Sequence, residues 1–338
     1  MSTIVKNETI NKKMKQSKLF DFETLNLADL MTRERISLTC APGGENHRGN
    51  QLIGRMPIKG EGFTANDIDE GLTPHFTELM GNERIQIVDL NAYSLEKKIN
   101  DLEDIDQARV LLLRSWVQHN FGDDATKSIY CEMKDDNWDS KFLDPNKYRT
   151  ELVDGVEVRK RGRVLNKHAR HNICYVDGMN QEANYLEGMG TIIDLKTKTQ
   201  LFLAVETLKK QIADGLLKIN SKTKVIINVV EGNRYYDVKK TGIGFHGDTE
   251  RVVVICISIG GSEYPMRWQW FKDRMPVGEA IDIELNDGDV YIMSEKAVGS
   301  DWKKGIPYTL RHSAGAEKYR TLKKWTKRAA EKAAKNKK

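Results

Sequence analysis

The chain has 338 residues, of which 39% are hydrophobic and 30% are charged, and its formal net charge is +5. This composition supplies enough apolar side chains for a substantial core and excludes a wholly disordered chain. The longest apolar run, 252–259, is far shorter than the roughly 20 residues of a membrane-spanning helix, so we expect no membrane segment. The four cysteines form no CxxC pair and the N-terminus has no apolar signal segment, which favours an intracellular protein with reduced thiols.

The positive charge is concentrated at the C-terminus. Residues 323–338 hold eight basic residues and one acidic residue, which leaves a net charge of −2 for the rest of the chain. This basic tail fits either a solvated helical extension or a segment that contacts phosphates. At the opposite end, the polar and lysine-rich residues 1–20 predict a flexible arm.

The first third of the chain gives few structural signals. Residues 21–104 form an N-terminal region of irregular pattern, in which we find no motif that carries chemistry. The apolar stretch 108–117 predicts a buried strand, and the polar stretch around 123–136 predicts a loop.

The second half is more regular. One face of an amphipathic helix is predicted by four apolar residues at helical spacing, with Gly215 as a natural stop: Leu201, Val205, Leu208 and Ile212. Six strand-like runs follow, separated by turn residues: 225–230, 252–259, 266–271, 281–285, 290–293 and 308–312. Short strands after one helix predict an α+β protein with an antiparallel β-sandwich or jelly-roll core and supporting helices.

The most informative motif is His246-Gly247-Asp248. In an extended chain positions i and i+2 project to the same side, so the imidazole and the carboxylate can reach one metal ion. Two histidines and one carboxylate on one face of an octahedron are typical of non-haem Fe(II) oxygenases. His312 is the one histidine after Asp248, and several predicted strands lie between them, as a jelly roll requires.

In its motifs the sequence resembles the AlkB-like Fe(II)/2-oxoglutarate-dependent dioxygenases. The resemblance is good over 199–320, loose over 105–198 and absent from the first hundred residues. It implies a dioxygenase domain over 105–322 with a double-stranded β-helix (jelly-roll) core. It also implies Fe(II) held by His246, Asp248 and His312, and 2-oxoglutarate bound by the Asn-x-Tyr pair Asn233 and Tyr235.

The sequence departs from the family near the second histidine. In the family this histidine follows a Trp and precedes a Pro-containing stretch, but here Lys304 stands at that place in 302–307. In one interpretation, the loop is rebuilt and His312 is the third ligand. In the other, Arg311 binds 2-oxoglutarate and the metal site lacks its second histidine. Lys304 is a poor substitute ligand, because a lysine must lose its proton before it can bind iron. We favour the first interpretation, because a histidine so close to the aligned position is otherwise unexplained.

In the wider superfamily a cation on the strand after the second histidine binds the distal carboxylate of 2-oxoglutarate. The candidates here are Lys318, Arg320 and Lys323. We select Arg320, because a planar guanidinium suits bidentate binding of a carboxylate.

Two further features have structural as well as functional interpretations. The basic stretch 159–172 fits either a positively charged hairpin or a phosphate-contacting lid, and its pair His168 and His171 lacks a third metal ligand nearby. Trp268 and Trp270 lie on one face of a strand, where core packing is more common than base stacking.

The resemblance implies hydroxylation or oxidative demethylation of a nucleic-acid base, with Fe(II) as cofactor, 2-oxoglutarate and O2 as co-substrates, and DNA or RNA as partner. The near-neutral body of the chain favours an alternative, the same chemistry on a protein side chain or small molecule. Lys304 at the place of the second histidine keeps another alternative open, a catalytically silent jelly-roll binding module with an incomplete iron site.

Overall fold

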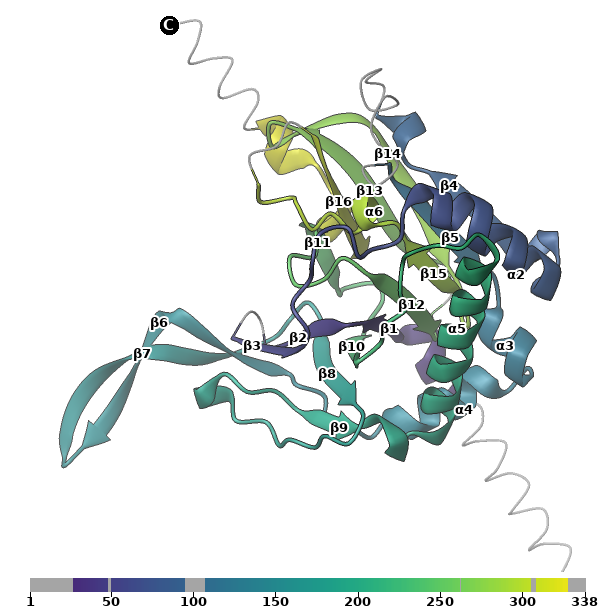
Figure 1. The fold of residues 1–338 in the computed structure, drawn as a ribbon. Coiled ribbons are helices and arrows are strands. Elements are labelled where there is room, and N and C mark those ends of the chain that lie inside the picture. The colour runs from purple at the N-terminus through teal and green to yellow at the C-terminus, as the bar shows by residue number, and fades with distance from the viewer. Residues whose placement is uncertain (1–26, 48–49, 95–106, 262, 305–307, 328–338) are drawn as a thin grey trace, which may run out of the picture.

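A computed structural model of the chain describes residues 27–47, 50–94, 107–261, 263–304 and 308–327. These residues form a mixed α+β fold, in which a large and a small sheet face each other and helices cover the outer side of the large one (Figure 1). The predicted arm 1–20 and residues 328–338 of the basic tail lie outside the described residues.

The large sheet has eight strands in the order β4-β5-β15-β12-β1-β10-β8-β9. Its strands are β1 (Arg35–Ala41), β4 (Ile85–Asp89), β5 (Arg109–Leu113), β8 (His171–Val176), β9 (Ile192–Asp194), β10 (Val229–Tyr235), β12 (Val254–Ile259) and β15 (Val290–Met293). Neighbouring strands are antiparallel except β8 and β9. Strand β1 comes from the predicted N-terminal region, yet it lies in the middle of the sheet between β10 and β12.

The small sheet has four antiparallel strands in the order β11-β16-β13-β14. They are β11 (Gly242–His246), β13 (Tyr264–Lys272), β14 (Met275–Leu285) and β16 (Tyr308–Gly315). Two hairpins complete the strands: β2 (Gly43–His47) with β3 (Gln51–Gly54), and β6 (Lys141–Val153) with β7 (Val156–Asn166). The β6–β7 hairpin extends from the body as an arm (Figure 1).

The helices are mostly short. They are α2 (Thr73–Met80), α3 (Trp116–Phe121), α4 (Ala125–Met133), α5 (Thr199–Lys218), α6 (Glu295–Val298) and α7 (Glu317–Arg320), with a π-helical turn η1 (Asp67–Leu72) before α2. Single 3-10 turns are η2 (Asn82–Arg84), η3 (Asn91–Tyr93), η6 (Tyr185–Glu187) and η7 (Leu195–Thr197).

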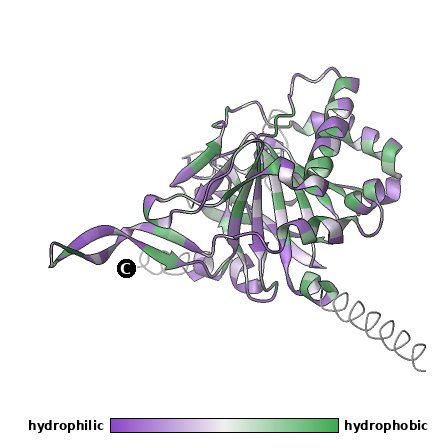
Figure 2. Ribbon diagram, turned by 90° about the horizontal axis from the view of Figure 1, so that it is seen from below, coloured by the Kyte–Doolittle hydropathy of each residue, from purple (hydrophilic) through white to green (hydrophobic). Residues whose placement is uncertain are grey.

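The apolar core has two layers, one on each face of the large sheet. Successive side chains of β1 point alternately toward one layer and the other. Ile36, Leu38 and Cys40 pack with α2 to α5 in the outer layer. The inner layer lies between the sheets and contains Trp268 and Trp270, both fully buried, so the expected core role of this pair is confirmed. In Figure 2 the hydrophobic segments gather in the body, whereas the arm carries long hydrophilic stretches.

The structure corrects three of the predicted boundaries. The predicted amphipathic helix is α5, but Gly215 does not end it. A Cβ at Gly215 would lie 3.1 Å from the side chain of Leu72, so this glycine lets α5 pack closely against η1. The stretch predicted as a loop around 123–136 contains α4, because Ile129, Tyr130 and Met133 share a buried face. The predicted strand 225–230 is wrong in its bounds, since β10 runs from Val229 to Tyr235.

Other expectations hold in part. The four cysteines are free thiols, and the stretch 108–117 contains β5 before α3 begins. The described start of the basic tail is anchored, because Trp325 is buried against Phe245 and Phe271. Among the described residues we find no helix of sufficient length and apolarity to cross a membrane.

We expect the outer layer to dominate the stability of the helical side. Leu208 on α5 is fully buried, so Leu208→Ala should lower the free energy of unfolding by about 2–5 kcal/mol through lost burial and a new cavity. Leu217→Ala on the same helix is the control, because Leu217 is 73% exposed. Urea denaturation measures both; equal losses in the two variants would contradict this packing.

Candidate metal centre

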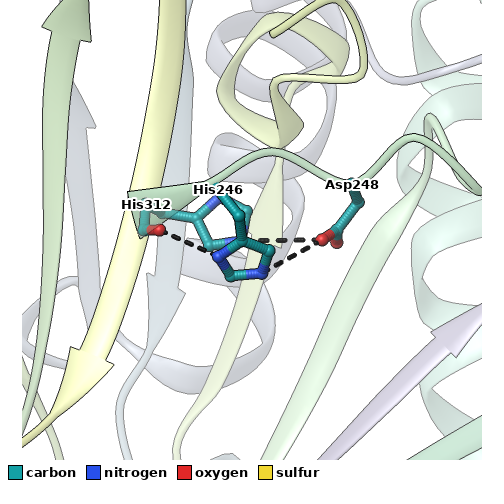
Figure 3. Close-up of side chains that lie close together, drawn as sticks. All are labelled: His246, Asp248 and His312. Carbon is teal, nitrogen blue, oxygen red and sulfur yellow. Dashed lines mark hydrogen bonds and ion pairs between the residues drawn. The ribbon is translucent and has the colours of Figure 1, made fainter. Parts of the chain in front are cut away.

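The pairing of β11 with β16 brings two histidines together. His246 ends β11 and lies opposite His312 of β16 in the antiparallel register. Asp248 follows two residues later, and its backbone N–H donates to the carbonyl of Val298. The three side chains converge from these two segments (Figure 3).

The distances define a compact cluster. His246 Nε2 lies 3.4 Å and His312 Nε2 lies 3.8 Å from Asp248 Oδ1. One potential ligand atom from each residue lies within 4.8 Å of the others. Among the described residues, these three side chains form the cluster of His, Cys, Asp or Glu that could hold a metal ion. Ligands bound at about 2.1 Å and at right angles lie about 3 Å apart, so only a small contraction is needed to bind one ion.

The tautomer of His246 is fixed by the backbone. Its Nδ1 lies 2.8 Å from the carbonyl oxygen of Gly244 and 3.1 Å from that of His312. Because carbonyl oxygens only accept hydrogen bonds, Nδ1 carries a proton, and Nε2 is the nitrogen that faces Asp248. This is the arrangement that metal-binding histidines use, with the second nitrogen held by a carbonyl.

The protonation of the other two residues also suits a metal. Burial lowers the pKa of His312 to about 3, aided by His246 and opposed by Asp248, so the imidazole is neutral at physiological pH. Burial alone would raise the pKa of the Asp248 carboxyl, but Arg251 and the two imidazoles outweigh it and hold that pKa below its usual range. The cluster therefore offers the neutral imidazole of His312 and the carboxylate of Asp248 beside Nε2 of His246.

A buried ionic network supports Asp248. Arg251 Nε lies 3.7 Å from Asp248 Oδ2, and Arg251 Nη2 donates to Glu231 and Glu250. Because Arg251 is almost fully buried, its pairing with several carboxylates compensates for the loss of water around it.

Gly247 lets the segment between the two ligands pass close to the loop at Gly299. A Cβ at this position would lie 2.0 Å from the carbonyl oxygen of Gly299. Any side chain there would push the His246–Asp248 segment away from the neighbouring loop, so the chemistry of the motif depends on glycine in its centre.

A cavity of about 200 Å³ opens between the two sheets beside the cluster, which is room for about six or seven water molecules. We call it the inner cavity; His246, Asp248 and His312 line it, as do Asn233 and Tyr235. Asn233 Oδ1 accepts hydrogen bonds from Arg170 and Asn172, whereas burial raises the pKa of Tyr235 to about 12 and keeps its hydroxyl protonated.

Strand β1 supplies residues of this region that the sequence analysis missed. Ser37 and Thr39 line the inner cavity. Arg35 precedes them on the same face of the strand but is not itself among the lining residues. Arg35 is fully buried and lies opposite Tyr235 in the register, with its guanidinium 5.5 Å from the ring of Tyr264. The signal that could have found it is the alternation of polar and apolar residues over 35–40, which is typical of a strand with one polar face.

Arg35 has spare hydrogen-bonding capacity. Its Nη1 donates to the carbonyl oxygens of Gly260, Gly261 and Leu285. Its Nε and Nη2 are buried and have no hydrogen-bond partner among the described residues. Buried donors of a charged group without partners are costly, so this guanidinium is a natural place for an anion.

The other cations from the sequence analysis lie elsewhere. Arg320 pairs with Asp282 and Glu317 and donates to the Gly315 carbonyl, outside the residues that line the inner cavity. Arg311 points to the opposite side of β16 from His312 and lies over the rings of Phe271 and Trp302. Lys304, Lys318 and Lys323 also lie outside the lining of the inner cavity.

The pair His168 and His171 gains no third ligand in the described structure. His171 stacks on Tyr236 with ring centroids 4.5 Å apart, and burial lowers the pKa of His171 to about 4. The metal-type cluster in the described part of the chain contains neither histidine.

Comparison with known proteins identifies a viral relative. The chain is 36% identical over 295 residues to the uncharacterized protein R156 of Acanthamoeba polyphaga mimivirus, which covers 85% of this chain and 98% of the relative. The chain therefore belongs to the same family as that protein. No protein-family model matches the chain.

The geometry predicts how divalent metal binding responds to mutation. His312→Ala should weaken binding of Mn(II) or anaerobic Fe(II) by at least tenfold, because it removes one of three converging ligands. His171→Ala should leave the affinity unchanged. Isothermal titration calorimetry measures both; an unchanged affinity in His312→Ala would place the metal elsewhere.

Proposed function

We propose that the protein is an Fe(II)- and 2-oxoglutarate-dependent dioxygenase that hydroxylates or oxidatively demethylates a nucleic-acid base. The observation that carries this proposal is the convergence of two imidazole Nε2 atoms and one carboxylate beside a cavity. Two histidines and one carboxylate, with positions left open for other ligands, are the donor set of non-haem Fe(II) oxygenases. The resemblance of 199–320 to AlkB-like enzymes points to the same chemistry.

The strand arrangement supports a jelly-roll core for this enzyme. A jelly roll has eight strands in two sheets. Strands β10 to β16 contribute seven strands in chain order, divided between the partial orders β15-β12-β1-β10 and β11-β16-β13-β14. We infer that β1 is the eighth strand, so that the N-terminal region completes the core instead of preceding it.

The residues present fit both iron and 2-oxoglutarate. His246, Asp248 and His312 would hold the iron, and the orphaned donors of buried Arg35 would hold the distal carboxylate of 2-oxoglutarate near Tyr235. Arg35 thus replaces Arg320 in our assignment, because Arg320 is already neutralised by Asp282 and Glu317. When bound, iron and 2-oxoglutarate would supply, together with O2, the oxidising chemistry needed at a substrate C–H bond.

The protein's own residues set the conditions for this chemistry. The carbonyls of Gly244 and His312 orient His246, and Arg251 keeps Asp248 ionised. Trp268 lies behind His312, with ring centroids 6.3 Å apart, and restricts the rotation of its imidazole. The walls of the inner cavity then decide which carbon of the substrate comes near the iron.

A protein side chain is the second candidate substrate. Glu45 lines the inner cavity, and a carboxylate favours a cationic group such as a lysine or arginine side chain, whereas Glu231 is already paired with Arg251. A base that is positively charged through N-methylation would suit the same acidic lining of the inner cavity. The resemblance to AlkB-like enzymes favours the base as substrate.

The direct test of the cofactors is an anaerobic titration. Fe(II) and 2-oxoglutarate together should give the weak visible charge-transfer band of a chelated ferrous ion. His312→Ala should lose this band, whereas Lys304→Ala should retain it. Succinate formation should rise when methylated oligonucleotides are added; no increase with any nucleic acid would contradict a nucleic-acid substrate, and no band would contradict the cofactors.

The assignment of Arg35 gives a separate prediction. Arg35→Met should raise the Kd for 2-oxoglutarate at least tenfold in the Mn(II)-loaded protein, because the charge-assisted hydrogen bonds to the carboxylate are lost. Arg320→Met is the control and should bind normally. Arg35→Lys, which keeps the charge, separates this loss from damage to the fold and should bind with intermediate affinity. Calorimetry decides: weaker binding in Arg320→Met alone would reverse the assignment.

A further inference from the structure

The chain forms a second cavity beside the inner one, which we call the outer cavity. Its volume is about 470 Å³, which is room for about fifteen water molecules and so for a small organic molecule. Three residues line both cavities: Glu45, Arg170 and Glu231. Lys167 lines the outer cavity alone, as do the aromatic residues Phe142 and Tyr319. The outer cavity therefore holds a primary amine and apolar ring surface in one space.

The amine of Lys167 has a hydrogen bond but no ion pair among the described residues. Its Nζ donates to Asn172 Oδ1 at 2.9 Å, and Asn172 lines the same cavity. The nearby carboxylates have other partners. Asp139 accepts hydrogen bonds from a threonine and a tyrosine, and Glu231 is paired with Arg251. No carboxylate therefore holds this amine in its charged form by direct contact in the described structure.

The surroundings of Lys167 favour the uncharged amine. Burial is the main reason that the pKa of Lys167 is lowered to about 8, and the positive charge of Arg170 adds to the effect. Three carboxylates oppose it: Asp139, Glu231 and Glu45. His47 and His171 also interact electrostatically with this amine, and both are neutral at physiological pH because burial lowers their pKa to about 4. At pH 7.5 an ordinary lysine is uncharged in about one molecule in a thousand, whereas Lys167 is uncharged in about a quarter.

Arg170 brings a second cation to the outer cavity and has donors left for a ligand. Its Nε donates to Asn233 Oδ1, and no hydrogen bond or ion pair of its two Nη atoms is present among the described residues. The charge of Arg170 lies close enough to Lys167 to influence its protonation. The planar pair of Nη atoms suits the two oxygens of a carboxylate.

We propose that Lys167 is a reactive amine that captures a small aldehyde carrying a carboxylate, with the carboxylate held by Arg170. The lone pair of Nζ attacks the carbonyl carbon and forms a C–N bond. The carbonyl oxygen then leaves as water with the two protons of the amine, and an imine remains. This step consumes no oxidant or reductant. It needs neither iron nor 2-oxoglutarate, so the capture site does not rest on the proposed function.

The test is covalent labelling of the full chain by 4-formylbenzoate, without iron, followed by reduction of the imine with cyanoborohydride. Mass spectrometry of peptides then locates the modified lysines. At pH 7.5 Lys167 should be modified at least tenfold faster than Lys210 on α5, whose side chain is 77% exposed, because far more of Lys167 is uncharged. The rate at Lys167 should rise with pH and reach half of its maximum near pH 8.

Two variants with matched controls separate the two parts of the site. Lys167→Arg keeps the positive charge and should remove this adduct, whereas Lys210→Arg should leave it unchanged. The methyl ester of 4-formylbenzoate has a similar aldehyde but no charge, so half-maximal capture by the wild type should need at least a tenfold higher concentration of the ester. Arg170→Met should abolish this difference between the two probes, because the partner of the carboxylate is lost.

The opposite outcomes are equally specific. Modification spread evenly over the exposed lysines, or a rate at Lys167 that reaches half of its maximum near pH 10, overturns the proposal. So does equal capture of the acid and its ester by the wild type. Failure of capture with an intact charge-transfer band contradicts only the capture site, and the reverse result contradicts only the proposed cofactors.

Discussion

The register between β11 and β16 is the constraint on which the candidate site depends. It places His246 opposite His312, and β16 is fixed on its other side by β13, where Trp268 lies opposite His312. A shift of one residue would turn His312 out of the inner cavity and bring Arg311 into its place, because neighbouring residues of a strand face opposite sides. Burial of Trp268 and Trp270 between the sheets opposes such a shift, so the packing of the core and the geometry of the site have the same cause.

The two buried arginines near the inner cavity, Arg251 and Arg35, differ in the partners that surround them. Buried Arg251 is compensated by Glu231, Glu250 and Asp248, which makes the ligand carboxylate a member of a closed ionic network. Among the described residues, buried Arg35 forms hydrogen bonds through Nη1, to backbone carbonyls, while its Nε and Nη2 have no hydrogen-bond partner. The binding of an incoming carboxylate is therefore more favourable at Arg35 than at Arg251, because at Arg251 it would compete with Glu231, Glu250 and Asp248.

The sequence predicted the local features and one distant pairing, that of His246 with His312, but not the place of β1. The His246-Gly-Asp248 motif needs only the geometry of one extended segment, and the period of α5 is visible within four turns. By contrast, β1 is short and its neighbours β10 and β12 lie some two hundred residues away, so its central place could not be inferred from the irregular pattern of 21–104. The resemblance directs the search for the cation to the chain after the second histidine, and so to Arg320. The sequence gives no sign that β1, from the beginning of the chain, places Arg35 beside β10.

Segments near the beginning and the end of the described chain both support the candidate site. β1 separates β10 from β12, so without it the large sheet would lose the hydrogen bonds that both neighbours form with it. Trp325 packs on Phe245, the residue before His246, and so supports the metal-side end of β11 from outside the sheet. One end of the chain thus builds the wall of the inner cavity and the other supports the strand that carries His246. Truncation from either end would therefore disturb the site before it removed any of the three clustered side chains.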